Sequence, residues 1–123
     1  MIKKVDHFVI TTGHLTECIK FYQALGFRSE EGDGRYELFS GNFKINVHIK
    51  GHELEPKAKN VKTGSADFCF EIEGNIDKCK EELMQKAIEI ELGIVTRQGV
   101  RGRMKSLYLR DPDGNLVELC SYE

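Results

Sequence analysis

Apolar residues recur along the chain with two spacings, and each spacing predicts a different secondary structure. Alternation of apolar and polar positions indicates a half-buried strand, whereas apolar positions three and four residues apart indicate an amphipathic helix. In the N-terminal half, Leu15, Cys18 and Tyr22 follow the helical spacing, and Gly26 ends the helix. Thr12 is the expected N-cap of this helix. The strands expected around it cover residues 5–10, 35–40 and 43–50.

The C-terminal half repeats this order of elements. Asn75 is placed to cap a helix whose apolar residues, among them Ile76 and Leu83, share one face. The strands expected around that helix cover residues 65–72, 90–95, 104–110 and 116–122. Each half is therefore predicted to have the order β-α-β-β-β, and the two copies are about 60 residues apart.

A polar segment without useful periodicity, residues 51–64, separates the two halves. It is interpreted as a linker, and a long surface loop explains it equally well. The predicted fold class is α+β, with one βαβββ module over about residues 1–50 and a second over 65–123. The whole chain, residues 1–123, has the usual length of a single domain.

Strand alternation also predicts which polar side chains share a face. Consecutive residues of a strand point to opposite sides, so the apolar residues of each strand fix the side of its polar residues. The residues expected on the polar face, at corresponding places in the first and last strands of each half, are His7, His48, Asp67 and Glu118. Each residue alone is more often simply solvated, but two imidazoles and two carboxylates on one face suit a borderline divalent cation.

Composition narrows the possible functions. The chain contains 18 Lys and Arg against 20 Asp and Glu, which gives a formal net charge of −2, and its pI is about 6.1. Nucleic-acid-binding domains are usually strongly basic, so we expect no nucleic-acid partner. With 40% hydrophobic and 31% charged residues, the chain is neither disordered nor of low complexity.

Hydrophobic runs and cysteines bear on the compartment. We expect neither a secretory signal nor a membrane-spanning segment, because no apolar run of the required length occurs. The four cysteines, Cys18, Cys69, Cys79 and Cys120, are widely spaced and form no Cys-x-x-Cys pair. Two disulfides would suit a secreted protein, but free, mostly buried thiols are the better interpretation. We therefore expect a cytoplasmic protein without a membrane partner.

Three motifs follow one another over nearly the whole chain. They are Asp6–Ile10 (DHFVI), Phe21–Phe27 (FYQALGF) and Tyr108–Glu118 (YLRDPDGNLVE). On these motifs the chain resembles the vicinal oxygen chelate superfamily, the type that includes glyoxalases, bleomycin resistance proteins and dioxygenases. The segments 46–48, 55–58 and 64–67 make it most similar to small glyoxalase-domain members that are sometimes labelled virulence proteins.

The resemblance implies two paired modules that form a curved mixed sheet around a metal-binding cup. His7 and Glu118 match ligand positions of the family. Asp67 falls where glyoxalases and extradiol dioxygenases usually have His, and His48 falls where glyoxalase I usually has a carboxylate. The implied cofactor is one divalent metal ion per site: Zn, Ni, Mn, Fe or Co.

The implied function is that of a metal-dependent enzyme, a glyoxalase-like lyase or isomerase. In such an enzyme the metal chelates two adjacent oxygens of a small-molecule substrate, and Glu118 is the catalytic general base. A role for Glu118 as a ligand alone is equally open. Two alternatives are a ring-opening enzyme of the extradiol-dioxygenase type, which would use His48 in its 2-His-1-carboxylate triad, and a non-catalytic ligand-binding or resistance module.

Other residues are candidates for substrate binding. Tyr108 and Arg110 share a face of their predicted strand and are placed to line the cup. Segment 96–105 is expected to be a basic loop in which Arg103 and its neighbours bind an anionic group or are simply solvated. The resemblance also implies a homodimer.

Overall fold

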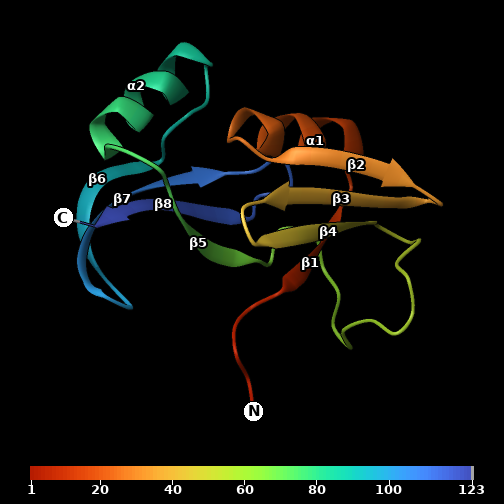
Figure 1. Ribbon diagram of the computed structural model, residues 1–123. Helices are drawn as coiled ribbons and strands as arrows, with labels where there is room; N and C mark the ends of the chain where they lie inside the picture. Colours follow the sequence, from red (N-terminus) through yellow and green to blue (C-terminus); the bar gives the residue numbers. More distant parts are fainter. Residues whose placement is uncertain (123) are drawn as a thin grey trace. The chain divides into compact units, whose positions relative to one another are not determined.

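The computed structural model describes residues 1–122, which fall into two compact units. Unit 1 covers Met1–Gly64, and unit 2 begins at Ser65. Each unit contains four strands and one helix in the predicted order β-α-β-β-β, as Figure 1 shows. The predicted α+β class is therefore confirmed, and the boundary between the units lies at the end of the predicted linker.

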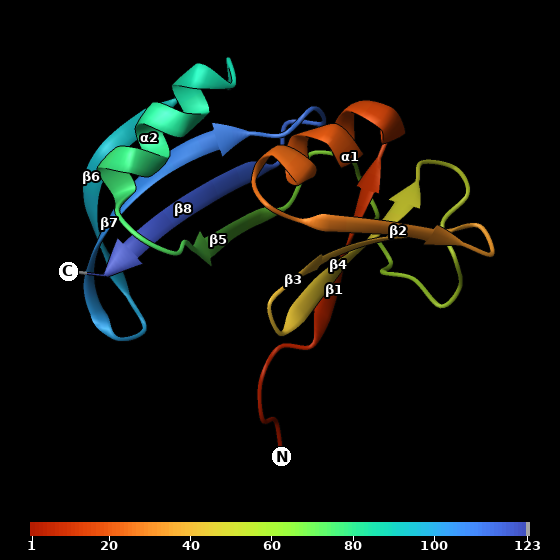
Figure 2. The ribbon, with the colours of Figure 1, turned by 45° about the horizontal axis from the view of Figure 1, so that its top comes forward.

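Unit 1 folds as one four-stranded mixed sheet with a helix on one face. Its elements are β1 (His7–Thr12), α1 (Leu15–Ala24), β2 (Arg28–Gly32), β3 (Arg35–Ser40) and β4 (Phe43–Ile49). The strand order is β1-β4-β3-β2, in which β1 runs parallel to β4 and the other pairs are antiparallel. Helix α1 lies across β2 and β3 in both views (Figures 1 and 2).

The core of unit 1 is formed by the apolar side of the sheet and the buried side of α1. Leu38 and Ile45 are paired across β3 and β4 and are fully buried. From the helix, Cys18 and Tyr22 are also fully buried, and the Tyr22 ring meets Phe27 edge-on. The predicted apolar sides of the first and last strands are confirmed, and the polar residues of β1 and β4 lie on the opposite face.

Unit 2 repeats this architecture, with a longer hairpin formed by its two middle strands in chain order. Its elements are β5 (Asp67–Glu71), α2 (Ile76–Gln85), β6 (Leu92–Gly99), β7 (Gly102–Arg110) and β8 (Leu116–Tyr122). The order is β5-β8-β7-β6, again with the outer first strand parallel to the last one. The apolar face buries Leu107, Leu109 and Val117 beneath α2, whose Ile76 and Leu83 are buried as well.

The ends of the elements differ from the predictions at three places. Helix α1 starts after His14, and Thr12 caps no helix but accepts a hydrogen bond at Oγ1 from the His14 backbone N–H at 2.9 Å. Strand β2 was not predicted, because it is short and mostly exposed and its residues show no apolar alternation. The predicted cap is confirmed at α2, where Asn75 Oδ1 accepts from the backbone N–H groups of Asp77 (2.7 Å) and Lys78 (3.2 Å).

The third difference concerns the expected basic loop over residues 96–105. These residues form the β6–β7 hairpin, whose strands are joined by Val100 and Arg101 alone. Arg101 holds the hairpin to the rest of unit 2, because its guanidinium makes two hydrogen bonds with Glu71, at 2.9 and 3.1 Å, and lies over the Tyr122 ring. The loop expectation is therefore wrong, because cross-strand pairing continues almost to the tip.

Cysteines and helices also bear on the expectations about compartment. All four cysteines have free thiols, of which Cys18 and Cys120 are buried, Cys79 is half-buried and Cys69 is exposed. Within residues 1–122, neither helix is long and apolar enough to cross a membrane.

Candidate functional site

In unit 1 the polar face carries two of the predicted ligands, at different levels along the strands. His7 is paired with Lys44, whereas His48 is paired with Thr11. The two histidines are therefore four residues apart in register, which corresponds to about 13 Å along the strand direction. Asn46, paired with Val9, lies between these levels and on the same face.

The His7 ring is oriented by its neighbour. Its Nδ1 lies 2.7 Å from Asp6 Oδ1, and this hydrogen bond is the main cause that lowers the pKa of the Asp6 carboxyl. With Nδ1 engaged by a carboxylate, Nε2 is the ring nitrogen that remains available to a ligand. Metal-binding histidines are typically held in this way, by a carboxylate on the nitrogen that does not bind the metal.

In unit 2 the polar face brings Asp67 and Glu118 close together. Asp67 is paired with Leu116, and Glu118 is paired with Cys69 on one side and Tyr108 on the other. Asp67 and Glu118 are thus two residues apart in register and share a face, within reach of one another. Partial desolvation of the sulfur, together with Cys120 and Glu118, raises the pKa of the Cys69 thiol although the residue as a whole is exposed, so this thiol stays protonated and is a poor nucleophile.

The sequence suggested that His48 and Glu118 occupy corresponding places in the last strands of the two halves. The register of the two sheets shows that they do not. His7 and Asp67 each occupy the first residue of the outer strand. The residue opposite the third position of that strand is Glu118 in unit 2 and Asn46 in unit 1. His48 corresponds to Cys120, not to Glu118, because it lies two residues farther along β4. Sequence reasoning missed Asn46, although its polar phase was visible.

The equivalent residues Asn46 and Glu118 each have a buried side-chain oxygen without a hydrogen-bond partner. Within residues 1–122 the buried side-chain atoms without a partner are Asn46 Oδ1, Ser106 Oγ and Glu118 Oε2. A buried carboxylate oxygen that accepts no hydrogen bond is costly unless a cation or a proton occupies it. The oxygens of Asn46 and Glu118, together with His7 Nε2, are donors of the type that borderline divalent metals take.

The metal-ligand prediction as a whole stays a prediction. Over residues 1–122, no group of three or more His, Cys, Asp or Glu side chains is close enough to hold a metal ion. Each unit does supply oriented or unpartnered donor atoms at equivalent positions of its polar face. The residues present therefore fit a divalent cation in chemistry.

A hydrogen-bonded turn fixes the strands that carry Asp67 and Glu118. Asn115, only 1% exposed, accepts at Oδ1 from the Ala66 N–H (2.9 Å) and donates from Nδ2 to Asp111 Oδ2 (2.7 Å). Asp111 is 4% exposed, and its Oδ1 accepts from the backbone N–H groups of Asp113 and Asn115. The sequence signal, Asp-Pro-Asp-Gly-Asn, predicted a turn but not this connection to the first strand of the unit.

Two of the three predicted substrate-binding residues, all of which lie in unit 2, form side-chain hydrogen bonds within the unit. Tyr108 lies beside Glu118, and its hydroxyl accepts a hydrogen bond from Arg97 Nε at 2.9 Å. Arg110 is on the same face but is held by both carboxylate oxygens of Glu91, each at 3.0 Å. Arg103 is exposed on β7. Of the three, Tyr108 is the residue that the structure places next to Glu118.

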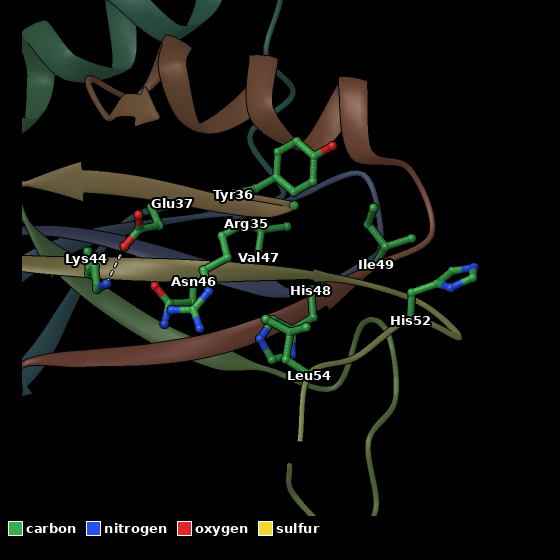
Figure 3. A pocket seen from close by; sticks show the side chains of 11 residues that line it. Arg35, Tyr36, Glu37, Lys44, Asn46, Val47, His48, Ile49, His52 and Leu54 are labelled. Carbon is green, nitrogen blue, oxygen red and sulfur yellow. Dashed lines mark hydrogen bonds and ion pairs between the residues drawn. The ribbon is translucent and has the colours of Figure 1, made fainter. Parts of the chain in front are cut away.

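Unit 1 also contains a cavity of about 110 Å³ on the polar face of β3 and β4, shown in Figure 3. Asn46 and His48 lie on β4, Arg35 begins β3, and Leu54 comes from the segment after β4. That segment turns back through a hydrogen bond from the His52 N–H to the Ile49 carbonyl at 2.8 Å. The cavity was not predicted, because it depends on the return of residues 50–54.

Comparison with known proteins identifies relatives over the full length. Residues 4–119 match the family model described as the Glyoxalase/Bleomycin resistance protein/Dioxygenase superfamily. The chain is 42% identical over 123 residues to the glyoxalase domain-containing protein RDO1 of Mycosarcoma maydis, a match that covers 99% of this chain and 70% of that protein. It is 40% identical over 124 residues to the virulence protein STM3117 of Salmonella typhimurium, covering 99% and 86%.

Solved structures agree with the sequence matches. The crystal structure of STM3117 superposes with a TM-score of 0.97 at 40% identity, covering 100% of this chain and 99% of that one. A lactoylglutathione lyase from Agrobacterium tumefaciens has a TM-score of 0.75 at 19% identity, over 98% and 95% of the two chains, and shares the fold. The resemblance that the three motifs indicated is confirmed. The chain belongs to the glyoxalase/bleomycin resistance protein/dioxygenase superfamily.

Proposed function

We propose that the chain is a metal-dependent small-molecule enzyme, a glyoxalase-like lyase or isomerase. The observation that carries the proposal is Glu118 Oε2, a buried carboxylate oxygen without a hydrogen-bond partner among the described residues. Desolvation of a carboxylate is unfavourable, and coordination of a cation compensates for it. The superfamily includes metal-dependent enzymes, which agrees with this interpretation.

Each unit offers candidate ligands on its own polar face. Unit 1 offers His7 Nε2, and unit 2 offers the carboxylates of Asp67 and Glu118. As a further ligand in unit 1, the register favours Asn46 Oδ1 over the predicted His48, because Asn46 lies two residues from the level of His7 and His48 lies four. When bound, a divalent metal supplies Lewis-acid stabilisation of charge on two adjacent substrate oxygens.

The proton chemistry is assigned to Glu118. Its half-buried side chain lies between Cys69 and Tyr108, so one oxygen is turned away from solvent. A carboxylate held in this setting can take a proton from a substrate carbon and return it to a neighbouring carbon or oxygen. The Tyr108 hydroxyl, which already accepts from Arg97, keeps its own proton for donation to a substrate oxygen.

Thermal unfolding with and without divalent ions tests the proposal. A ligand that binds only the folded chain at 100 times its Kd adds about 2.7 kcal/mol to the free energy of unfolding. We expect Zn²⁺, Ni²⁺ or Mn²⁺ to raise the Tm of the wild-type chain and chelator to reverse the rise. Glu118→Gln, which keeps the shape and removes the charge, should abolish the rise, and Glu73→Gln in the exposed bend between β5 and α2 should not. An equal rise in both variants would contradict the proposal.

The second candidate, a ligand-binding module without catalysis, is favoured by the cavity of unit 1. That cavity needs no metal to exist. Stabilisation by an organic ligand that chelator leaves undiminished, together with no stabilisation by divalent ions, would favour this alternative. A ring-opening enzyme is disfavoured, because a 2-His-1-carboxylate triad would need His7 and His48 at one level, and they are four residues apart in register.

A further inference from the structure

We infer that the cavity of unit 1 binds the carboxylate group of a small organic acid, with Arg35 as its cationic anchor. The inference names the substrate class and rests on the proposed function, in which a small molecule is bound on this polar face. Its evidence is confined to unit 1 and consists of an unpaired cation, an amide without a hydrogen-bond partner and a cavity of limited size that opens to solvent.

The first observation is the pairing of the charges around the cavity. Lys44 forms an ion pair with Glu37, and both side chains are about three-quarters buried. The Arg35 side chain forms no ion pair or hydrogen bond within the described part of the chain. The ion pair with Lys44 neutralises Glu37, the acidic residue that lines the cavity. Arg35 is therefore left as a permanent positive charge at the cavity wall.

The second observation is the position of Arg35 relative to the polar groups of β4. Arg35 precedes Tyr36, the partner of Val47, so it falls beside His48 on the polar face. In Figure 3, Arg35 leaves β3 on the side where Asn46 and His48 leave β4, while Tyr36 points the opposite way, toward α1. A guanidinium, an amide and an imidazole therefore face the same space.

The Asn46 amide indicates that this space takes a polar ligand. Its Oδ1 is buried and makes no hydrogen bond, and its side chain contributes no hydrogen bond to the sheet. The oxygen and nitrogen of an amide are interchangeable by a rotation of the group. Asn46 can therefore present either a donor or an acceptor to a bound molecule, or to a metal and a ligand on its two sides.

The chemistry of the wall favours a carboxylate over a phosphate. A guanidinium matches a carboxylate with two parallel hydrogen bonds, and this recognition is geometric as well as electrostatic. Phosphate carries more charge and is usually held by several cations or a helix N-terminus. The other permanently charged cation at this wall, Lys44, is already paired with Glu37. Leu54 provides an apolar boundary, and a cavity of about 110 Å³ suits a short carbon chain.

Titration of the isotope-labelled full chain, followed by amide chemical shifts, tests the inference. Sodium propionate, propionamide and inorganic phosphate are added separately to metal-free protein and to zinc-loaded protein. We expect propionate to shift the amide signals of residues 34–37 and 46–49 in a saturable manner. Because a hydrogen bond to a charged group contributes about 1.5–3 kcal/mol, Arg35→Gln should weaken propionate binding roughly tenfold to a hundredfold.

Two variants provide matched comparisons. Arg28→Gln removes a cation from the same sheet that is already paired with Glu30 at 2.7 Å, and it should leave the propionate affinity unchanged. Arg35→Lys keeps the charge and loses the planar fork, so its affinity should lie between those of wild type and Arg35→Gln.

The outcomes separate this inference from the metal proposal. Propionate binding to metal-free wild-type chain that is lost in Arg35→Gln supports the inference even if no divalent ion binds. Equal binding by wild type and Arg35→Gln, equal binding of propionamide, or tighter binding of phosphate than of propionate would overturn it. None of these results depends on whether Glu118 binds a metal.

Discussion

Units 1 and 2 share one architecture and differ in the chemistry of their polar faces. Both have a four-stranded sheet in which the first and last strands are parallel neighbours, with a single helix on the apolar face. On the other face, His7 and Asn46 in unit 1 stand where Asp67 and Glu118 stand in unit 2. The same backbone therefore presents a neutral amide in one copy and a carboxylate in the other.

The difference shows which residues the fold depends on and which it leaves open. Buried apolar residues recur at matching positions, for example Ile45 in unit 1 and Val117 in unit 2, because each must pack beneath a helix. Residues of the opposite phase make few contacts with that core. Two copies of one unit can thus keep a common fold while their polar faces carry different side chains.

The largest expected difference between the units concerns how much the contact at the start of the parallel pair, between the first and last strands, contributes to stability. In unit 2 the Asn115 side chain reinforces this joint, whereas in unit 1 the corresponding contact is a single backbone bond from Lys44 N–H to the Asp6 carbonyl at 3.3 Å. Asn115→Ala leaves the Ala66 N–H and the buried Asp111 carboxylate with unmet hydrogen bonds. We expect a loss of about 2–4 kcal/mol in the free energy of unfolding.

Urea unfolding of the whole chain measures this effect. Asn60→Ala, a change at an exposed turn residue, is the matched control and should change stability by less than about 0.5 kcal/mol. If Asn115→Ala proved as mild as the control, the turn would not be what fixes the strands of unit 2.

The next prediction concerns the ligand positions of the two copies. If Asn46 is the equivalent of Glu118, then Asn46→Ala should weaken Zn²⁺ binding by about tenfold, the effect of roughly 1.4 kcal/mol. His48→Ala, two residues farther along β4, should change the affinity by less than twofold. Isothermal titration gives both values. The reverse order of effects would restore His48 as the fourth ligand and break the correspondence between the units.

A smaller difference is expected at the helix N-termini. Asn75 caps α2 with its side chain, whereas the N-cap residue of α1, His14, makes no side-chain hydrogen bond to the helix. Asn75→Ala should therefore cost about 1 kcal/mol, and His14→Ala should cost much less. Thermal unfolding compares the two variants directly, and equal losses would show that the cap is not what distinguishes the helices.

The smallest expected effect is a pH dependence in unit 2. The hydrogen bonds from Arg110 hold the pKa of Glu91 below its ordinary value of 4.5. The pair therefore stabilises the folded chain fully above pH 4.5, and this contribution is lost as the pH falls through the lowered pKa. Arg110→Gln should raise the pKa of Glu91, measured by carboxyl NMR titration. Its stability deficit against wild type should shrink below pH 4.5, and a deficit that grows there would be contrary to this assignment.

The sequence predicted the parts of the structure that follow from local periodicity. The repeated element order, the apolar phases around Ile45 and Val117 and the Asn75 cap are all confirmed, because each depends on residues close in sequence. Strand β2 was missed because it carries little apolar signal.

The candidate site was less predictable because it depends on strand register. Phase alone placed His48 and Glu118 on polar faces, but pairing decides the level of each residue along the sheet, and pairing is not local. The hydrogen bond from the Ala66 N–H to the Asn115 side chain and the cavity beside Arg35 depend on contacts between segments that are distant in sequence. Neither therefore had a periodic signal.

Elemental analysis of the chain, purified without chelator and equilibrated with divalent ions, tests the central claim most directly. We predict about one divalent ion per chain in wild type and in Glu73→Gln, and little or none in Glu118→Gln, all of them folded. A folded wild-type chain that carries no divalent ion after this treatment would contradict the account.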